Sequence, residues 1–112
     1  MRELKFRAWY GKKFNYFSLG ETNKYPSNVM AFPVNQYTGL KDKNGKEIYE
    51  GDVLEYRDGT DYAHFKIYWN EKDARFYDTR IEDGDSQTGY DGFNFFTDCK
   101  IIGNIHENPE LL

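Results

Sequence analysis

The chain has 112 residues, a formal net charge of −4 and a pI near 5.1, which fits one domain and argues against a general nucleic-acid coat, because such proteins carry a basic surface. Only 38% of the residues are apolar, but 19% are aromatic, and large rings bury much surface per residue. We therefore expect an ordered domain whose small core is built from rings.

Three further features predict where the protein works. No stretch approaches the roughly 18 apolar residues of a membrane span, and residues 1–5 lack the apolar region of a secretory signal. The single cysteine, Cys99, has no partner for an internal disulfide. We expect a protein of the cytoplasm, without a membrane partner.

The first strand is predicted over residues 4–10, which alternate with the period of two that is typical of a half-buried strand. One face holds Leu4, Phe6, Ala8 and Tyr10, and the other holds Lys5, Arg7 and Trp9. A turn at residues 11–13 leads to a return strand at residues 14–17. Residues 18–36 contain Gly20, Pro26 and Pro33 and predict a long irregular connector.

The middle of the chain predicts a hairpin around Asn44-Gly45, a pair that favours a two-residue turn with positive φ at both positions. Residues 37–41 and 46–49 form its arms, and Gly51-Asp52 leads into the next strand. Tyr37, Leu40, Ile48 and Val53 are expected to pack in the core.

The second half alternates again. Residues 62–69 place Ala63, Phe65, Ile67 and Trp69 on the core face and Tyr62, His64, Lys66 and Tyr68 on the other. Further strands are predicted at residues 75–81, 92–97 and 98–105, with a polar loop at residues 82–89. Strands at this spacing, without a helical period, predict an all-β fold, a small barrel or roll.

Three blocks of the sequence resemble the YopX family. The longest is Tyr37-Thr38-Gly39-Leu40-Lys41-Asp42-Lys43-Asn44-Gly45-Lys46-Glu47-Ile48-Tyr49-Glu50-Gly51-Asp52-Val53. The opening Lys5-Phe6-Arg7-Ala8-Trp9 and the closing residues 102–111 resemble the same family. The resemblance implies a small phage or prophage protein with an SH3-like barrel and no established activity, cofactor or catalytic residue.

This resemblance and the strand pattern together predict a single domain over residues 1–112. Within it, residues 1–36 form an N-terminal hairpin and connector, residues 37–106 the barrel core, and residues 107–112 a tail. No segment of the sequence suggests a second domain or an internal repeat.

The residues that most resemble chemical sites favour structural roles. Cys99 falls on the same face of its predicted strand as the apolar neighbours, which indicates a buried thiol. One cysteine and two histidines are too few ligands for a structural zinc site. Residues 83–94 lack the glycine and glutamate positions of a calcium loop. Asp42, Glu47, Glu50 and Asp52 surround the hairpin, where carboxylates usually cap turns. The sequence thus names no catalytic, metal-binding or cofactor-binding residue.

The predicted interaction face combines two rows of residues, each from the side of a predicted strand that faces away from the core. The first row is Lys5, Arg7 and Trp9, and the second row is Tyr62, His64, Lys66 and Tyr68. Rings and cations mixed on one face suit protein interfaces and also base stacking with phosphate contact. A third interpretation is that these rings exceed what the core can hold and bind no partner. Residues 1–56 carry a basic excess and residues 57–112 an acidic one, which suits contact between copies.

From these observations we expect a non-enzymatic protein-interaction module that forms a homo-oligomer or binds another phage or host protein. The alternative is a small-barrel nucleic-acid-binding protein, whose binding would be salt-sensitive. A basic groove would favour nucleic acid, and an apolar patch of mixed charge would favour protein.

Overall fold

The computed structural model describes residues 4–18, 32–72, 74–81, 89–90 and 96–112. These residues form nine strands and two short 3-10 helices. In chain order the strands are β1 (Lys5–Trp9), β2 (Phe14–Ser18), β3 (Val34–Lys41), β4 (Glu47–Tyr49), β5 (Asp52–Asp58), β6 (Asp61–Asn70), β7 (Arg75–Ile81), β8 (Gly89–Tyr90) and β9 (Lys100–Asn104). The 3-10 helices are η3 (Phe96–Asp98) and η4 (Pro109–Leu111).

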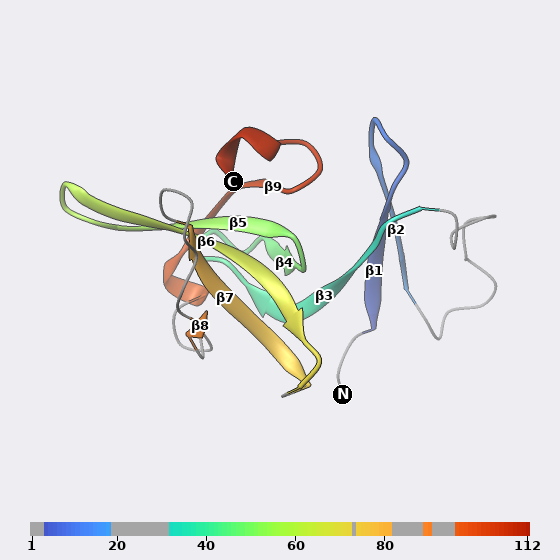
Figure 1. Ribbon diagram of the computed structural model, residues 1–112, viewed down its shortest axis with the longest axis horizontal. Coiled ribbons are helices and arrows are strands. Elements are labelled where there is room, and N and C mark those ends of the chain that lie inside the picture. The colour runs from blue at the N-terminus through green and yellow to red at the C-terminus, as the bar shows by residue number, and fades with distance from the viewer. Residues whose placement is uncertain (1–3, 19–31, 73, 82–88, 91–95) are drawn as a thin grey trace.

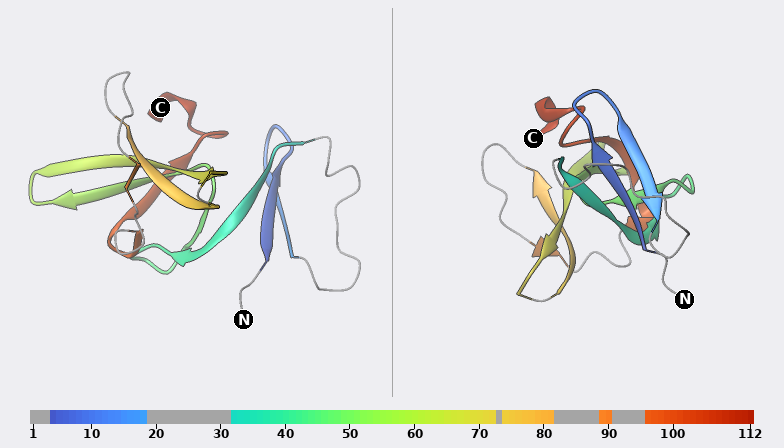
Figure 2. Two further views of the ribbon diagram at one scale, coloured as in Figure 1. Left: turned by 60° about the horizontal axis from the view of Figure 1, so that its bottom comes forward. Right: turned by 90° about the vertical axis from the view of Figure 1, so that its right-hand side faces the viewer.

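The strands form two antiparallel sheets, which confirms the all-β prediction. The first sheet has the order β2-β1-β3-β4, and the second has the order β8-β7-β6-β5-β9. Within the described residues, the two sheets do not join into a closed barrel. The chain passes from the first to the second at Gly51, between β4 and β5. Figures 1 and 2 show the β5–β6 hairpin projecting at one end of the molecule and the β1–β2 hairpin standing near the other.

Several predicted elements differ from the observed ones. β3 begins at Val34, inside the predicted connector. The predicted strand over residues 92–97 ends in a 3-10 helix, because Phe96 and Thr97 belong to η3. Residues 92–95 lie outside the described part of the chain, as do residues 82–88 of the polar loop. The last residues contain the one-turn helix η4, which begins at a proline.

The Asn44-Gly45 turn forms as predicted but with a different geometry. Gly45 has φ +82 and is left-handed. Asn44 is not, because Ala74 is the only residue other than glycine with positive φ in the described chain. The Gly45 N–H donates to the Asp42 carbonyl at 3.0 Å. Asp42 Oδ1 also accepts the N–H groups of Asn44 and Lys46, each at 2.9 Å. The turn therefore has one left-handed residue where two were expected, and the Asp42 side chain caps it.

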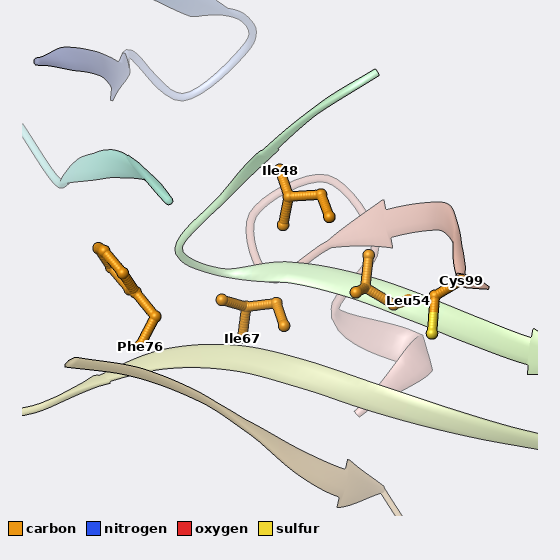
Figure 3. Close-up of a cluster of buried hydrophobic side chains, with 5 residues drawn as sticks. All are labelled: Ile48, Leu54, Ile67, Phe76 and Cys99. Atoms are coloured by element: carbon orange, nitrogen blue, oxygen red, sulfur yellow. The ribbon is translucent and has the colours of Figure 1, made fainter. Parts of the chain in front are cut away.

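The largest buried cluster is mostly aliphatic, while rings make up part of the remaining core, where Tyr37, Tyr49 and Phe65 are buried. The cluster lies between β4, β5, β6, β7 and the start of β9 (Figure 3) and consists of Ile48, Leu54, Ile67, Phe76 and Cys99. Phe65 is buried as predicted, but Trp69 is 37% exposed. The four residues of the hairpin block expected to pack all do so, with Tyr37, Ile48 and Val53 buried and Leu40 against the cluster.

Cys99 is fully buried, as its parity predicted, and burial raises the pKa of its thiol to about 12. A thiol with this pKa stays protonated at neutral pH and is a poor nucleophile. No helix of the described residues is long and apolar enough to cross a membrane.

Candidate functional site

A cleft of about 430 Å³ lies between the first sheet and β9 with the turn that follows it. We call it the inter-sheet cleft. Arg7, Tyr16 and Tyr49 line it from the first sheet, and Ile102 and Glu107 line it from the other side. The segments that flank β4 and β9 are hydrogen-bonded to each other beyond both ends of these strands. At one end Lys43 N–H donates to the Cys99 carbonyl at 2.9 Å, and at the other Ile105 N–H donates to the Gly51 carbonyl at 2.9 Å.

A buried ion pair forms part of the cleft wall. Arg7 Nη2 lies 2.8 Å from Asp52 Oδ1, and the two side chains are only 5% and 3% exposed. The same Nη2 donates to the Glu50 carbonyl at 3.2 Å, while Asp52 Oδ2 accepts the Tyr49 N–H at 2.8 Å. The pair therefore joins β1 to the β4–β5 turn, and it does so through the Gly51-Asp52 step of the family-like block.

Two rings enclose the guanidinium of Arg7. Its Cζ lies 4.2 Å from the Phe14 ring centroid and 5.0 Å from that of Tyr49, distances at which a cation is attracted to a ring face. Arg7 Nε is buried and has no hydrogen-bond partner among the described residues. Phe14 and Tyr49 thus both contact a charge, and Tyr49 is itself buried.

Burial dominates the proton equilibria of this site. It raises the pKa of Asp52 above its ordinary value, and the guanidinium of Arg7 opposes the rise. Burial, followed by the nearby carboxylate of Glu47, raises the pKa of Tyr49 well above its usual range. Tyr49 therefore remains a neutral hydrogen-bond donor, and its hydroxyl donates to Glu47 Oε1 at 3.2 Å.

The open side of the cleft carries both signs of charge. Glu47 Oε2 lies 2.5 Å from Lys5 Nζ in a pair whose side chains are each 30% exposed. Lys46 and Glu107 are exposed at opposite sides of the same cleft. Tyr16 is 56% exposed. The inter-sheet cleft therefore combines rings, apolar side chains and mixed charge.

The turn after β9 closes the far side. Asn104 Oδ1 accepts the N–H groups of His106 and Glu107 at 3.0 and 2.9 Å, and its Nδ2 donates to Glu107 Oε1 at 2.8 Å. This turn places the His106 ring on Trp9, with centroids 5.5 Å apart and planes 16° apart. His106 Nε2 also lies 3.1 Å from Asn35 Oδ1.

His106 gives the fold a predicted pH dependence. Burial lowers the pKa of His106, Arg7 lowers it further, and Glu107 opposes both. Because the folded-state pKa lies below the unfolded value, the folded chain binds fewer protons, so stability is full above about pH 6.5 and falls as the pH drops below it. We expect His106→Gln to be less stable at neutral pH but to lose less on acidification.

The measurement is urea denaturation of the wild type and His106→Gln at about pH 7.5 and pH 5. His64→Gln is the control, since it removes the other histidine. Equal losses in the wild type and His106→Gln would contradict the prediction.

The first predicted row, Lys5, Arg7 and Trp9, faces the cleft side of the first sheet and is mostly covered. Arg7 is 4% exposed, so the expectation that it lies on an outer face is wrong. The β4–β5 turn and the turn after β9 cover this side, which a period-two pattern in one strand cannot reveal. Lys5 pairs with Glu47 and Trp9 with His106, as described above.

The second row lies on β6 in the other sheet. Tyr62 is 58% exposed near the tip of the β5–β6 hairpin, and Arg57 Cζ lies 5.2 Å from the centroid of its ring. His64 Nε2 lies 3.0 Å from Glu55 Oε2, and this hydrogen bond, with that from Arg57, lowers the pKa of Glu55. Lys66 and Tyr68 are half-buried. The two rows therefore belong to different sheets and make no single continuous face.

Sequence reasoning missed Tyr16, Asn104 and Glu107 as site residues. Tyr16 stood in a predicted strand with no assigned face. Asn104 and Glu107 stood in the closing family-like block, where an asparagine two residues before His106 was the available sign of a side-chain-capped turn. No group of three or more His, Cys, Asp or Glu side chains within the described ranges is arranged to hold a metal ion.

Comparison with known proteins gives two findings. The family model described as YopX protein matches residues 11–112. A solved structure, described as the crystal structure of protein EF1440 from Enterococcus faecalis, is similar with a TM-score of 0.62 and 27% sequence identity, covering 100% of this chain and 99% of that one. A search of the curated proteins gave no match. Because the family model covers nearly the whole chain, including the cleft residues from Tyr16 onward, the chain belongs to the YopX family.

Proposed function

We propose that this chain is a non-enzymatic protein-interaction module that self-associates and works in the cytoplasm of a bacterium carrying a phage or prophage. The observation that carries the proposal is the composition of the inter-sheet cleft. Tyr16 and Ile102 supply ring and aliphatic surface, while Lys46 and Glu107 supply opposite charges. A concave surface with these properties suits a protein segment, since rings anchor interfaces and polar groups surround them.

The nucleic-acid alternative is less favoured because the basic groups of the first row are neutralised. Lys5 and Arg7 each pair with a carboxylate, and a phosphate would have to compete with Glu47 and Asp52 for them. A binding site for single-stranded nucleic acid needs cations that are free to contact the backbone, beside rings on which bases stack.

Photo-crosslinking from the cleft tests the proposal. A photoreactive amino acid replaces Glu107, which is exposed and lines the cleft, and in a control chain replaces Glu71, which is exposed in the β6–β7 turn. We expect protein adducts from position 107 and few from position 71 when the chain is produced in a bacterial host. Equal adducts from both positions, or nucleic acid as the main adduct of position 107, would overturn the proposal.

Two solution measurements separate its parts. Sedimentation velocity at micromolar concentration tests self-association, and a strict monomer removes that part. Fluorescence anisotropy with a single-stranded oligonucleotide at about 50 mM salt tests the alternative. Binding that falls with salt and is weakened by Lys5→Ala or Tyr62→Ala would favour nucleic acid instead.

A further inference from the structure

Strand β2 is the open end of the first sheet. It pairs with β1 in an unbroken antiparallel register from Lys5↔Ser18 to Trp9↔Phe14, and in the described chain no strand pairs with its other side. Its five residues, Phe14–Ser18, include three rings and contain no charge, proline or bulge. Natural proteins usually protect sheet ends with charges, prolines, bulges or very short strands, because unpaired backbone groups bind other strands.

The other three sheet ends have such protection. β8 is only two residues long. β4 is only three residues long. The segments that flank β9 bond to those that flank β4, through Lys43 N–H to the Cys99 carbonyl and Ile105 N–H to the Gly51 carbonyl, and the Ile101 N–H of β9 donates to Asp42 Oδ2 at 3.0 Å. Among the sheet ends of the described residues, β2 is therefore the one that remains available to another strand.

The register shows which backbone groups of β2 point outward. Trp9 N–H donates to the Pro33 carbonyl, toward β3, and Tyr10 N–H donates to the Lys13 carbonyl, toward the β2 side. Because these directions alternate along an antiparallel strand, Phe6 and Ala8 bond to their β2 partners Phe17 and Asn15. The N–H and C=O groups of Phe14, Tyr16 and Ser18 then face away from β1.

We propose that β2 pairs with β2 of a second copy, antiparallel and centred on Tyr16, so that two first sheets form one continuous sheet. This rests on the self-association part of the proposed function and names its surface. The outward positions 14, 16 and 18 are symmetric about 16, so a two-fold axis there matches each donor and acceptor with its equivalent, as an isologous interface requires.

Charge favours the antiparallel orientation. Lys12 and Lys13 precede β2. In the antiparallel arrangement the Lys13 residues of the two copies lie six strand positions apart, about 20 Å at about 3.4 Å per residue, beyond the screening length of about 8 Å at physiological salt. A parallel arrangement would place the four lysines side by side.

Tyr16→Pro and Tyr16→Val form the decisive pair of variants. Both remove the ring, but only proline removes the outward N–H, and proline is tolerated on an edge strand where that N–H is unpaired. We expect sedimentation velocity to give a wild-type dimer at micromolar concentration and a dissociation constant at least about tenfold higher for Tyr16→Pro than for Tyr16→Val, since two central hydrogen bonds are lost per dimer. Thermal unfolding of both variants checks that they fold.

A cysteine at the same position gives a test that does not depend on the proline variant. Hydrogen-bonded antiparallel partners have Cα atoms about 5.5 Å apart, within the range that a disulfide spans, so Tyr16→Cys should oxidise to a covalent dimer, whereas Lys12→Cys should not. Native Cys99 is buried and does not compete.

The outcomes distinguish this inference from the function on which it rests. A strict monomer overturns both the β2 pairing and the self-association. A dimer that neither links through Tyr16→Cys nor weakens in Tyr16→Pro overturns the β2 pairing and leaves self-association through another surface. If Tyr16→Pro does not fold, the disulfide result decides.

Discussion

Replacing Asp52 with alanine is expected to lower the free energy of unfolding by about 3–5 kcal/mol, because it leaves the buried Arg7 guanidinium without its counter-charge. Arg7 is 4% exposed and cannot turn to solvent without leaving Phe14 and Tyr49. The substitution also leaves the Tyr49 N–H without its acceptor. Urea denaturation of the wild type and the variant measures the loss.

The matched control is the double variant Arg7→Met with Asp52→Leu. Replacing both members of a buried ion pair by apolar residues is often close to neutral, so the double variant should lose much less stability than Asp52→Ala alone. A double variant as unstable as the single one would show that the pair is not what makes Asp52 important.

Replacing Leu54 with alanine is expected to cost about 2–5 kcal/mol, the range for large-to-small changes in a well-packed core. Leu54 is fully buried in the cluster drawn in Figure 3, and its β5 backbone pairs with both β6 and β9. Little of the chain around it can collapse into the space left by the missing side chain.

Tyr62→Ala is the control for Leu54→Ala, since Tyr62 lies in the same sheet but is 58% exposed. Exposed substitutions usually change stability by no more than about 0.5 kcal/mol. Denaturation midpoints of both variants, with m-values, test the contrast. Comparable losses from the two substitutions would mean that the aliphatic cluster does not dominate the stability of this sheet.

Much of the fold could be predicted because it depends on local patterns. Alternation located β1 and β6, and the Asn44-Gly45 pair located the β3–β4 hairpin. The turn geometry was less accessible, because Asp42 satisfies three backbone N–H groups, one of them from distant Ile101. A side chain that bonds across both sheets leaves no mark in local spacing.

The site was harder to predict for a related reason. The alternation in β1 correctly placed Arg7 and Ala8 on opposite faces of the strand. Both are nevertheless buried, because other parts of the chain cover each face. The partner of Arg7 is Asp52, and a single sequence does not indicate such a pairing. Asp52 was assigned a structural role among the hairpin carboxylates, without its partner or its burial.

The order of strands along the chain has a consequence for how the molecule assembles. Most neighbouring strands in the two sheets are joined by short turns, but β9 pairs with β5 only after the chain has passed through β6, β7 and β8. Closing such a long loop costs more entropy than closing a hairpin, so we expect β9 to dock late in folding. β9 is also one wall of the inter-sheet cleft. A partner that binds there would therefore bind only chains in which β9 has already docked on β5.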